Sequence, residues 1–475
     1  MTMGSTSKLA VVVMAAGKGT RLKSRRPKVL HEIGGKPLLG HVIAAASRVV
    51  APSDIKVIVG HQSERVREAM GATGVVFVEQ AEQRGTGHAV QCASEAIAGY
   101  TDVLVLSGDV PLIRTETIRQ VFEFHHKNDA AMTILTTAIE DPTGYGRVMR
   151  RSADSADVES IIEQPDLKPD QHSIREINSG IYAFKTATLL AHLRKLTAEN
   201  NKSELYLTDM AAILCSEGER VVAVQVAQAA EVLGANTIAE LVTLDATLRA
   251  ATAKRLMDSG VTIFRPDTCV IDADVEIGPD TVIEPFVQLL GHTRIGADCH
   301  IRSYNVVESC TIGNGVLLRP GCMLEHSTVG DGAEIGPFAH LRPGCEIGEK
   351  AHIGNFVEGK KVRLGKGSKA NHLTYLGDAD VGPGTNIGAG VITCNYDGAR
   401  KYQTRIGSGV FVGSDSTLVA PITIDDGAYI GAGSCITKDV PAGALAVGRS
   451  RQVTKEGWAH ARRARIEENR KEPAR

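Results

Sequence analysis

The feature that most constrains this fold is an internal repeat that begins after Gly260, in which an aliphatic residue precedes a glycine that opens a turn. The aliphatic positions recur at multiples of six, as with Ile277 and Ile295, which are 18 residues apart. Two spacings, Ile295 to Ile312 and Ile387 to Ile406, miss a multiple of six by one residue and predict bulges or loops. Eighteen residues per coil, divided into three faces of six, predict a solenoid of short, stacked parallel strands.

The composition supports a solenoid and limits the partners. Aromatic residues make up 4% of the chain and glycine accounts for 49 of its 475 residues, so we expect an aliphatic core with many tight turns. The formal net charge of -2 gives no electrostatic reason to bind nucleic acid or an anionic membrane. We therefore expect small-molecule substrates, with any anionic ligand held by local charge.

Cysteine usage and the N-terminal apolar run point to a cytoplasmic protein. None of the nine cysteines forms a Cys-x-x-Cys pair, and most lie within the repeat as small apolar residues. The run Leu9–Ala16 is too short to span a bilayer and leads directly into Gly17–Gly19 rather than a cleavage site. We interpret it as a first β-strand.

The N-terminal half alternates between apolar runs and amphipathic stretches, which predicts a mostly parallel sheet covered by helices. We expect three domains or segments: a nucleotide-binding domain over 1–236, a connecting helix over 237–259, and the repeat domain with a charged tail over 260–475. The expected strands are Leu9–Met14, Ile55–Val59 and Val103–Leu106, and the expected helices are Pro37–Val50, Thr115–His126 and Thr237–Asp258.

A glycine-rich turn, Ala15–Arg21, follows the first expected strand, and Pro27–Leu30 comes shortly after it. Backbone N–H groups at such a turn face phosphate, and Lys18 and Arg21 add positive charge. The turn is neither a P-loop nor a dinucleotide fingerprint, because Leu22 stands where the third glycine should be. Alone, it is equally compatible with an ordinary strand-to-helix turn.

Three later groups of residues strengthen the prediction of a nucleotide site. Each lies where a strand is expected to deliver its carboxyl end, which is where open α/β sheets bind ligands. Asp109 supplies a hard oxygen ligand suited to Mg²⁺, although it is also placed to cap a following helix. The groups are Gln80 with Gly85–Gly87, Ser107–Asp109, and Thr143–Arg147 with Glu163 and Asn178–Gly180.

These motifs resemble the sugar-nucleotide pyrophosphorylases, and in particular the bifunctional N-acetylglucosamine-1-phosphate uridyltransferases. The resemblance implies Mg²⁺ as the cofactor, held by Asp109 and Asn236. Ser107 departs from the pattern, because that position often holds Tyr, so we leave it outside the site. The resemblance implies that Ala15, Ala16, Gly17, Lys18, Arg21, Lys28, Gln80, Gly85 and Thr86 contact UTP, and that Gly146, Glu163 and Asn178 contact the sugar phosphate.

Several residues in the repeat have no architectural use, and they stand in four runs that resemble the acetyltransferase half of the same family. The resemblance implies that His372 is the general base toward the amino group of glucosamine-1-phosphate. It further implies that Arg342 and Lys360 hold the sugar's phosphate, although surface solvation is the ordinary role of such residues. Tyr375 and Asn386 would hold the sugar. Ala389, Asn395, Tyr396, Ser414, Ala432 and Arg449 would bind acetyl-CoA, with the Ala389 N–H near the oxyanion.

As a whole, the resemblance implies an α/β fold: a Rossmann-like nucleotidyltransferase domain followed by a left-handed parallel β-helix of hexapeptide repeats. It also implies a homotrimer that supplies UDP-N-acetylglucosamine for cell-wall synthesis. The tail from Arg449 to Arg475 is dense in charge and predicts a solvated helix or a frayed end, in which Trp458 alone hints at docking.

Two other interpretations stay open at this point. The chain is also compatible with a single-activity nucleotidyltransferase whose β-helix only assembles the enzyme, as in relatives of ADP-glucose pyrophosphorylase. His372 with Asn395 and Tyr396 argues against that. A non-enzymatic nucleotide-exchange subunit that keeps this fold as a scaffold would not need catalytic Lys and Asp residues, yet Lys18, Arg21, Lys28 and Asp109 are all present.

Overall fold

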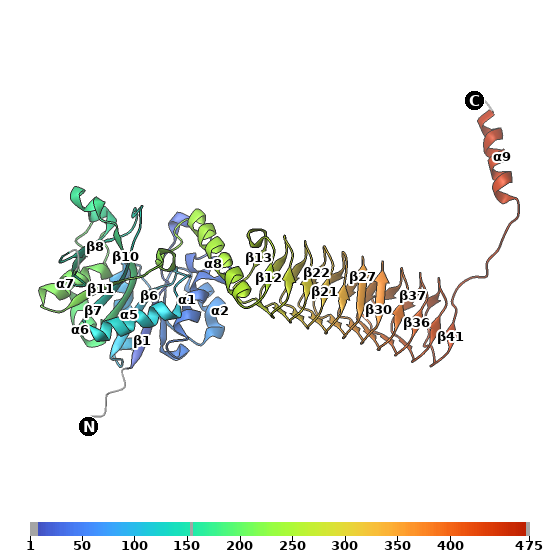
Figure 1. Cartoon of the computed structure of the whole chain (residues 1–475), viewed down its shortest axis with the longest axis horizontal. Helices are drawn as coiled ribbons and strands as arrows, with labels where there is room; N and C mark the ends of the chain where they lie inside the picture. Colours follow the sequence, from blue (N-terminus) through green and yellow to red (C-terminus); the bar gives the residue numbers. More distant parts are fainter. Residues whose placement is uncertain (1–7, 153–154, 472–475) are drawn as a thin grey trace, which may run out of the picture. The chain divides into compact units, whose positions relative to one another are not determined.

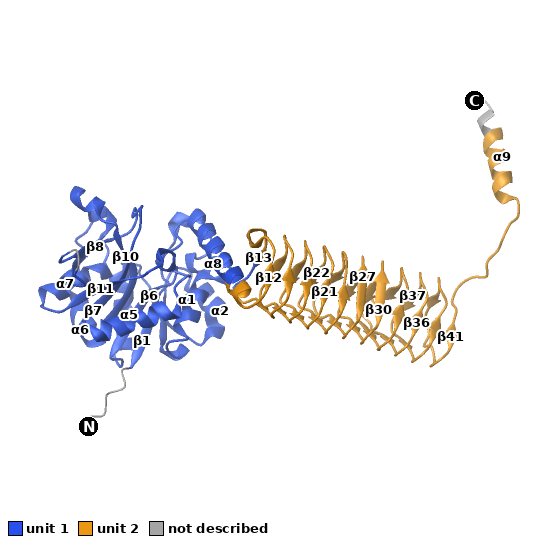
Figure 2. Ribbon diagram, viewed as in Figure 1, with its two compact units in different colours: residues 1–254, 271–273 blue, residues 255–270, 274–475 orange. Residues whose placement is uncertain are grey.

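The computed structural model describes residues 8–152 and 155–471, and these form two compact units (Figure 2). Unit 1 comprises residues up to Lys254 together with Ile271–Ala273, and unit 2 comprises Arg255–Val270 and the chain from Asp274 onward. The division falls inside the helix that was expected to link the domains. That helix is confirmed as a single element, α8 (Ile238–Asp258), although most of it belongs to unit 1.

Unit 1 is built on a sheet whose strands run in the order β11-β7-β10-β6-β1-β4-β5 (Figure 1). All neighbouring pairs in this order are parallel except those of β10, which is antiparallel to both β6 and β7. The predicted mostly parallel sheet is therefore confirmed. The strands are β1 (Leu9–Met14), β4 (Ile55–Val59), β5 (Val76–Glu79), β6 (Asp102–Ser107), β7 (Met132–Ala138), β10 (Glu176–Lys185) and β11 (Val221–Gln225).

Helices cover both faces of this sheet because its strands are apolar on both sides. In β1, Val11 and Val13 pack on one face with α1, α2 and α5, while Ala10 and Val12 pack on the other with α3, α4, α6 and α7. Helix α1 ends earlier than expected, at Ala46, while α5 runs one residue further than expected. The helices are α1 (Leu38–Ala46), α2 (Ser63–Met70), α3 (Thr86–Cys92), α4 (Ser94–Ile97), α5 (Thr115–Lys127), α6 (Thr186–His192) and α7 (Met210–Ser216).

The third predicted group of residues reaches the same edge of the sheet as the other two groups, but from the start of a strand rather than from its end. We expected each group to follow a strand, but Asn178 lies near the start of β10. Because β10 is antiparallel to β6, its start lies beside the carboxyl end of β6. The hairpin of β8 (Arg147–Arg150) and β9 (Val158–Ile162) pairs with β10 next to it, with Ile177 opposite Arg147.

Unit 2 is the predicted left-handed parallel β-helix. Its short strands form three parallel sheets of eleven, ten and nine strands, hydrogen-bonded from coil to coil (Figure 1). The repeat positions pair as expected, so that Ile277 lies opposite Ile295. In most of the short strands one aliphatic residue faces inward and is buried, as Ile335 and Ile353 are.

The two irregular spacings have different structural outcomes. Ile295 pairs directly with Ile312, so that coil simply has 17 residues and needs no bulge. The expected loop is present at the second irregularity: Ile387 pairs with Val412, 25 residues later, because the chain between β34 (Ile392–Cys394) and β35 (Thr404–Ile406) forms an extra loop closed by a bridge between Tyr396 and Lys401.

The C-terminal tail contains the predicted helix, α9 (Trp458–Lys471), and Trp458 is 57% exposed. Within residues 8–152 and 155–471, no helix is long and apolar enough to cross a membrane.

Candidate functional site

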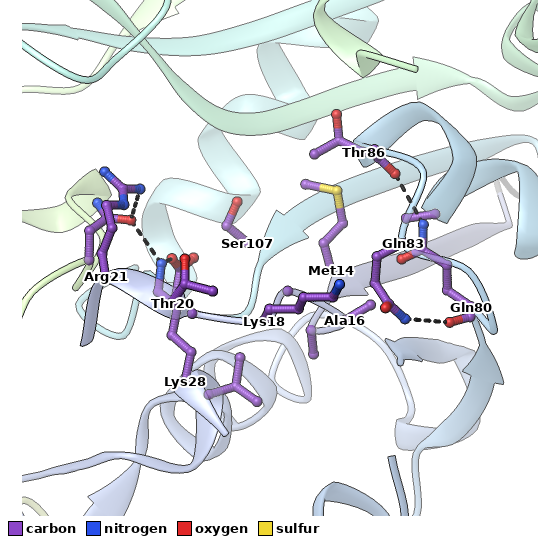
Figure 3. Close-up of a pocket in the computed structure, with 18 of the residues that line it drawn as sticks. Met14, Ala16, Lys18, Thr20, Arg21, Lys28, Gln80, Gln83, Thr86 and Ser107 are labelled. Carbon is purple, nitrogen blue, oxygen red and sulfur yellow. Dashed lines mark hydrogen bonds and ion pairs between the residues drawn. The ribbon is translucent and has the colours of Figure 1, made fainter. Parts of the chain in front are cut away.

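The carboxyl ends of β1, β5 and β6 surround a cavity of about 560 Å³ in unit 1 (Figure 3). The glycine-rich turn forms one wall, and the segment from Gln80 to Thr86 forms the opposite wall. The cavity brings together most of the residues predicted to contact the nucleotide and metal: Ala15, Ala16, Gly17, Lys18, Arg21, Lys28, Gln80, Gly85, Thr86, Asp109 and Asn236.

Local backbone geometry explains why a glycine stands at position 85, in the second of these walls. Gly85 has a φ of 111°, and a side chain there would collide with the backbone of Leu205. This close approach lets the amide of Gly87 donate to the Leu205 carbonyl at 2.7 Å and the amide of Leu207 donate to the Thr86 hydroxyl at 2.9 Å. The wall is thereby fixed to the segment that carries Glu204, which also lines the cavity.

A charged cluster occupies one end of the cavity. The Lys28 ammonium forms an ion pair with the Asp109 carboxylate and donates to Asn236 Oδ1 at 2.9 Å. The same oxygen accepts a hydrogen bond from Arg21 Nη2 at 2.7 Å. Asp109 is not the helix cap that was considered for it, since α5 begins after Arg114 without a side-chain cap.

The oxygens of Asp109 and Asn236 both contact the Lys28 ammonium, so they converge on a point that already holds a cation. Protein sites for Mg²⁺ commonly supply one or two oxygen ligands and leave the rest to phosphate and water. The pair fits that pattern. No group of three or more His, Cys, Asp or Glu suited to a metal exists in the described part of the chain.

The predicted sugar-phosphate residues do not line this cavity but form a second group beside β10. The Asn178 amide donates to the Gly146 carbonyl at 2.9 Å, and Asn178 Nδ2 donates to the Tyr182 hydroxyl at 2.7 Å. Glu163 accepts a hydrogen bond from the Thr208 hydroxyl at 3.2 Å. Burial raises the pKa of Glu163 above its ordinary value.

Sequence reasoning missed several cavity residues. Ser107 was left outside the site, yet it lines the cavity, and its hydroxyl donates to the Gly180 carbonyl at 3.3 Å. Its position after β6 was the available signal. The other unpredicted lining residues are Met14, Gly19, Thr20, Val29, Gln83, Ala89 and Glu204.

In unit 2, one group of predicted residues lies along the ten-stranded sheet. Lys360, at the end of β28 (Glu358–Lys360), donates to Asp378 at 3.0 Å, and the Asn395 amide donates to the same carboxylate at 2.5 Å. The hydrogen bond that Lys360 donates to the Asp378 carboxylate raises the pKa of Lys360. Lys360 is thus held in place rather than freely solvated.

Arg342, which directly follows the strand β25 (His340–Leu341), and Tyr375 lie along the same sheet. Arg342 Nη1 donates to Glu358 at 3.0 Å, and Tyr375 opens β31 (Tyr375–Gly377), directly opposite Glu358. Sequence reasoning did not anticipate that both predicted phosphate-binding cations would be paired with carboxylates, because the partners lie one coil away from them in the chain.

The second group lies along the eleven-stranded sheet and contains His372. The strands concerned are β27 (His352–Asn355), β30 (Lys369–His372), β33 (Asn386–Ile387), β36 (Phe411–Val412) and β39 (Tyr429–Ile430). His372 lies two residues after Ala370, and Asn355, Ala389, Ser414 and Ala432 hold the equivalent place in their coils. The predicted base and three predicted acetyl-CoA residues therefore form one column along the coils.

His372 is exposed beside a shallow cavity of about 300 Å³ that Asn355 and Arg319 also line. His372 Nδ1 lies 2.8 Å from Asn355 Oδ1. Because an amide oxygen only accepts, this contact places a proton on Nδ1, so that in the neutral ring Nε2 is the nitrogen that carries the lone pair. Asn355 was not predicted, although its place in the column was a usable signal.

The structure of one chain thus divides the predicted acetyltransferase residues between two sheets. Asn386 lies in the eleven-stranded sheet with His372, opposite Lys369 and Phe411. The remaining residues lie along the ten-stranded sheet: Arg342, Lys360, Tyr375 and Asn395. Tyr396 projects into the extra loop, where its hydroxyl donates to Gly398, and Arg449 donates to the Ala432 carbonyl at 2.8 Å.

Comparisons with known proteins match both units. The nucleotidyl transferase family model matches residues 10–265, and the bacterial transferase hexapeptide model matches residues 274–309, 326–358 and 403–438. The chain is 62% identical to the Bifunctional protein GlmU of Koribacter versatilis over 463 residues, covering 97% of this chain and 99% of that protein. It is 46% identical to the GlmU of Pelobacter propionicus and 44% identical to that of Streptococcus agalactiae, covering 95% and 94% of this chain and 98% and 97% of those proteins.

The raised pKa of Glu163 predicts a pH-dependent stability effect. A carboxyl with a raised folded-state pKa binds its proton more tightly when folded, so its contribution to stability is lost as pH rises from the unfolded value toward the folded one. Glu163→Gln removes that loss, so its advantage in melting temperature over the wild type should grow between about pH 4 and pH 7. Thermal unfolding of unit 1 measures it.

The exposed Glu159, on β9 just before Glu163, provides the control. Glu159→Gln should give a difference that stays near zero across this range. A Glu163→Gln advantage that is constant or shrinks with pH would contradict the assigned burial.

Proposed function

This chain belongs to the family of bifunctional GlmU proteins, and we propose that its two units catalyse successive steps in the synthesis of UDP-N-acetylglucosamine. Unit 2 transfers acetyl from acetyl-CoA to glucosamine-1-phosphate. Unit 1 then transfers uridylyl from UTP to N-acetylglucosamine-1-phosphate and releases pyrophosphate. The observation that carries this proposal is the 62% identity to a GlmU protein over 463 residues, a length that includes both units.

Uridylyl transfer needs no general base, because the attacking phosphate oxygen of the sugar is already anionic. Its obstacle is repulsion between the phosphates. Lys18, Arg21 and Lys28 all line the cavity, where their charges offset that repulsion in the ground state and stabilise the charge that develops on the departing pyrophosphate. The cavity walls orient the two reactants for in-line attack.

Asp109 and Asn236 would hold Mg²⁺ when UTP is bound, as the convergence of their oxygens supports. The ion supplies charge neutralisation at the reacting phosphates. Binding at this point requires the Lys28 ammonium to move away from Asp109, and the phosphates provide the new partner for Lys28.

Acetyl transfer needs a base, because the amino group must lose a proton as it attacks the thioester. His372 Nε2 takes that proton, while Asn355 holds the ring proton on Nδ1. The column of Ala389, Ser414 and Ala432 continues from His372 along the coils and provides a path for acetyl-CoA. The Ala389 N–H stabilises the oxyanion.

We further propose that the acetyltransferase site is completed between copies of the chain in a homotrimer. The supporting observation is the division of the predicted residues between two sheets. Lys360 and Arg342 of one copy would bind the phosphate of a sugar whose amino group faces His372 of another copy. Glu358 and Asp378 keep these cations in position until the phosphate arrives.

Asp109→Asn tests the assignment of unit 1. Loss of one carboxylate charge weakens the hold on the metal, so uridylyl transfer should fall by roughly 10²-fold, while acetyl transfer is unchanged. Separate assays of pyrophosphate release and coenzyme A release measure the two activities. Glu68→Gln, which changes an exposed carboxylate on α2, should leave both rates at the wild-type value. Equal loss of both activities in folded Asp109→Asn would contradict the assignment.

His372→Ala tests the assignment of unit 2. The change removes the base but no inward-facing residue, so the β-helix should keep its melting temperature and kcat for coenzyme A release should fall by ~10²–10⁴-fold. Uridylyl transfer should be untouched. The deficit should shrink as pH rises, because more of the amine is then already deprotonated.

His300, an exposed histidine on the same sheet, provides the matched control. His300→Ala should acetylate at the wild-type rate at every pH. A His372→Ala variant with near wild-type kcat would show that His372 is not the base.

A further inference from the structure

Gln80 is buried at the end of β5 and is 3% exposed, yet it lines the cavity of unit 1. Its backbone carbonyl accepts a hydrogen bond from Gln83 Nε2 at 3.0 Å (Figure 3). Its carboxamide makes two further contacts: Nε2 lies 3.1 Å from the Gly85 carbonyl oxygen and 3.1 Å from His88 Nδ1.

These two contacts fix which end of the carboxamide faces which way. A carbonyl oxygen only accepts, so the NH₂ group must face Gly85. Its second hydrogen then points at His88 Nδ1, which must be the unprotonated nitrogen of a neutral ring. Both donors of the carboxamide are used, and no described residue donates to Gln80 Oε1. The group that Gln80 offers to a ligand is therefore a hydrogen-bond acceptor.

Uracil and cytosine differ in the group that each would present to this acceptor. Uracil carries a donor at N3, whereas cytosine carries an acceptor there. An acceptor at Gln80 Oε1 matches uracil N3–H and faces the lone pair of cytosine N3. A carboxamide that flipped by half a turn would present NH₂ and match cytosine instead. Selection of uracil over cytosine thus depends on the contacts that prevent the Gln80 carboxamide from flipping.

We propose that His88 is a positioning residue that locks the Gln80 carboxamide and so enforces selection of UTP over CTP. A carboxamide held only by the Gly85 carbonyl would have one amide hydrogen without an acceptor. His88 Nδ1, on the following helix α3, provides that acceptor. His88 acts through Gln80 and does not touch the reacting phosphates. This inference rests on the proposed function of unit 1, because it takes UTP as the substrate.

The test is a competition for N-acetylglucosamine-1-phosphate between equal concentrations of UTP and CTP, with the two nucleotide sugars measured by mass. His88→Phe keeps the ring but lacks the acceptor, and we expect its UTP-to-CTP product ratio to fall by about threefold to tenfold, the value of one neutral hydrogen bond. His88→Leu should fall by a similar factor. His88→Asn places Oδ1 where Nδ1 was and should recover most of the wild-type ratio.

Cys92→Ser provides the control, because Cys92 contacts the other side of the same ring, with Sγ 3.9 Å from His88 Nε2. It should leave the ratio unchanged. The melting temperature of each variant, compared with that of the wild type, reports whether unit 1, which carries His88, is folded.

Two results would overturn the inference in different ways. If His88→Phe and His88→Leu lose rate equally with UTP and CTP, so that the ratio stays constant, His88 is only structural. If His88→Asn selects no better than His88→Phe, the acceptor is not what matters. A wild-type chain that makes no nucleotide sugar at all would refute the proposed function of unit 1, and the inference with it.

Discussion

Hydrogen bonding between parallel strands is the constraint on which both units depend. In unit 1, parallel pairing of β1 with β4 and β6 places the carboxyl ends of these strands at one edge, where the segments that follow them enclose the cavity. In unit 2, the same pairing stacks each coil on the one before it, so that equivalent positions form columns. Both sites are therefore built by register: residues distant in sequence meet because their strands are aligned.

Charge pairing prepares both sites for anionic substrates. Lys28 is held by Asp109 and Asn236, Lys360 by Asp378, and Arg342 by Glu358. A free cation on a long side chain would lose conformational entropy when a phosphate binds, whereas Lys28, Lys360 and Arg342 are already held in position. The cost is that a phosphate or metal must compete with the existing partner. The exposed ion pair between Arg342 and Glu358 is screened by water, so a phosphate displaces its carboxylate more easily than those that hold Lys28 and Lys360.

The sequence predicted much of this because regular features carry strong local signals. The spacing of Ile277, Ile295 and their equivalents predicted the β-helix, and the apolar run of β1 predicted its strand to the residue. What it could not predict were contacts set by register between distant segments. Asn355 beside His372 and Asp378 beside Lys360 arise from coil stacking, and the reversed direction of β10 is a property of topology rather than of local pattern.

The central claim is that one chain performs both transfers. The direct measurement is a single reaction containing the wild-type chain, glucosamine-1-phosphate, acetyl-CoA, UTP and Mg²⁺, with all products quantified by mass. We predict UDP-N-acetylglucosamine and pyrophosphate in equal amounts, together with at least as much coenzyme A. A parallel reaction supplies the same chain with N-acetylglucosamine-1-phosphate in place of glucosamine-1-phosphate and acetyl-CoA, which isolates the second step. Formation of pyrophosphate there, with no release of coenzyme A in the complete reaction, would contradict the account and leave unit 2 as an assembly scaffold.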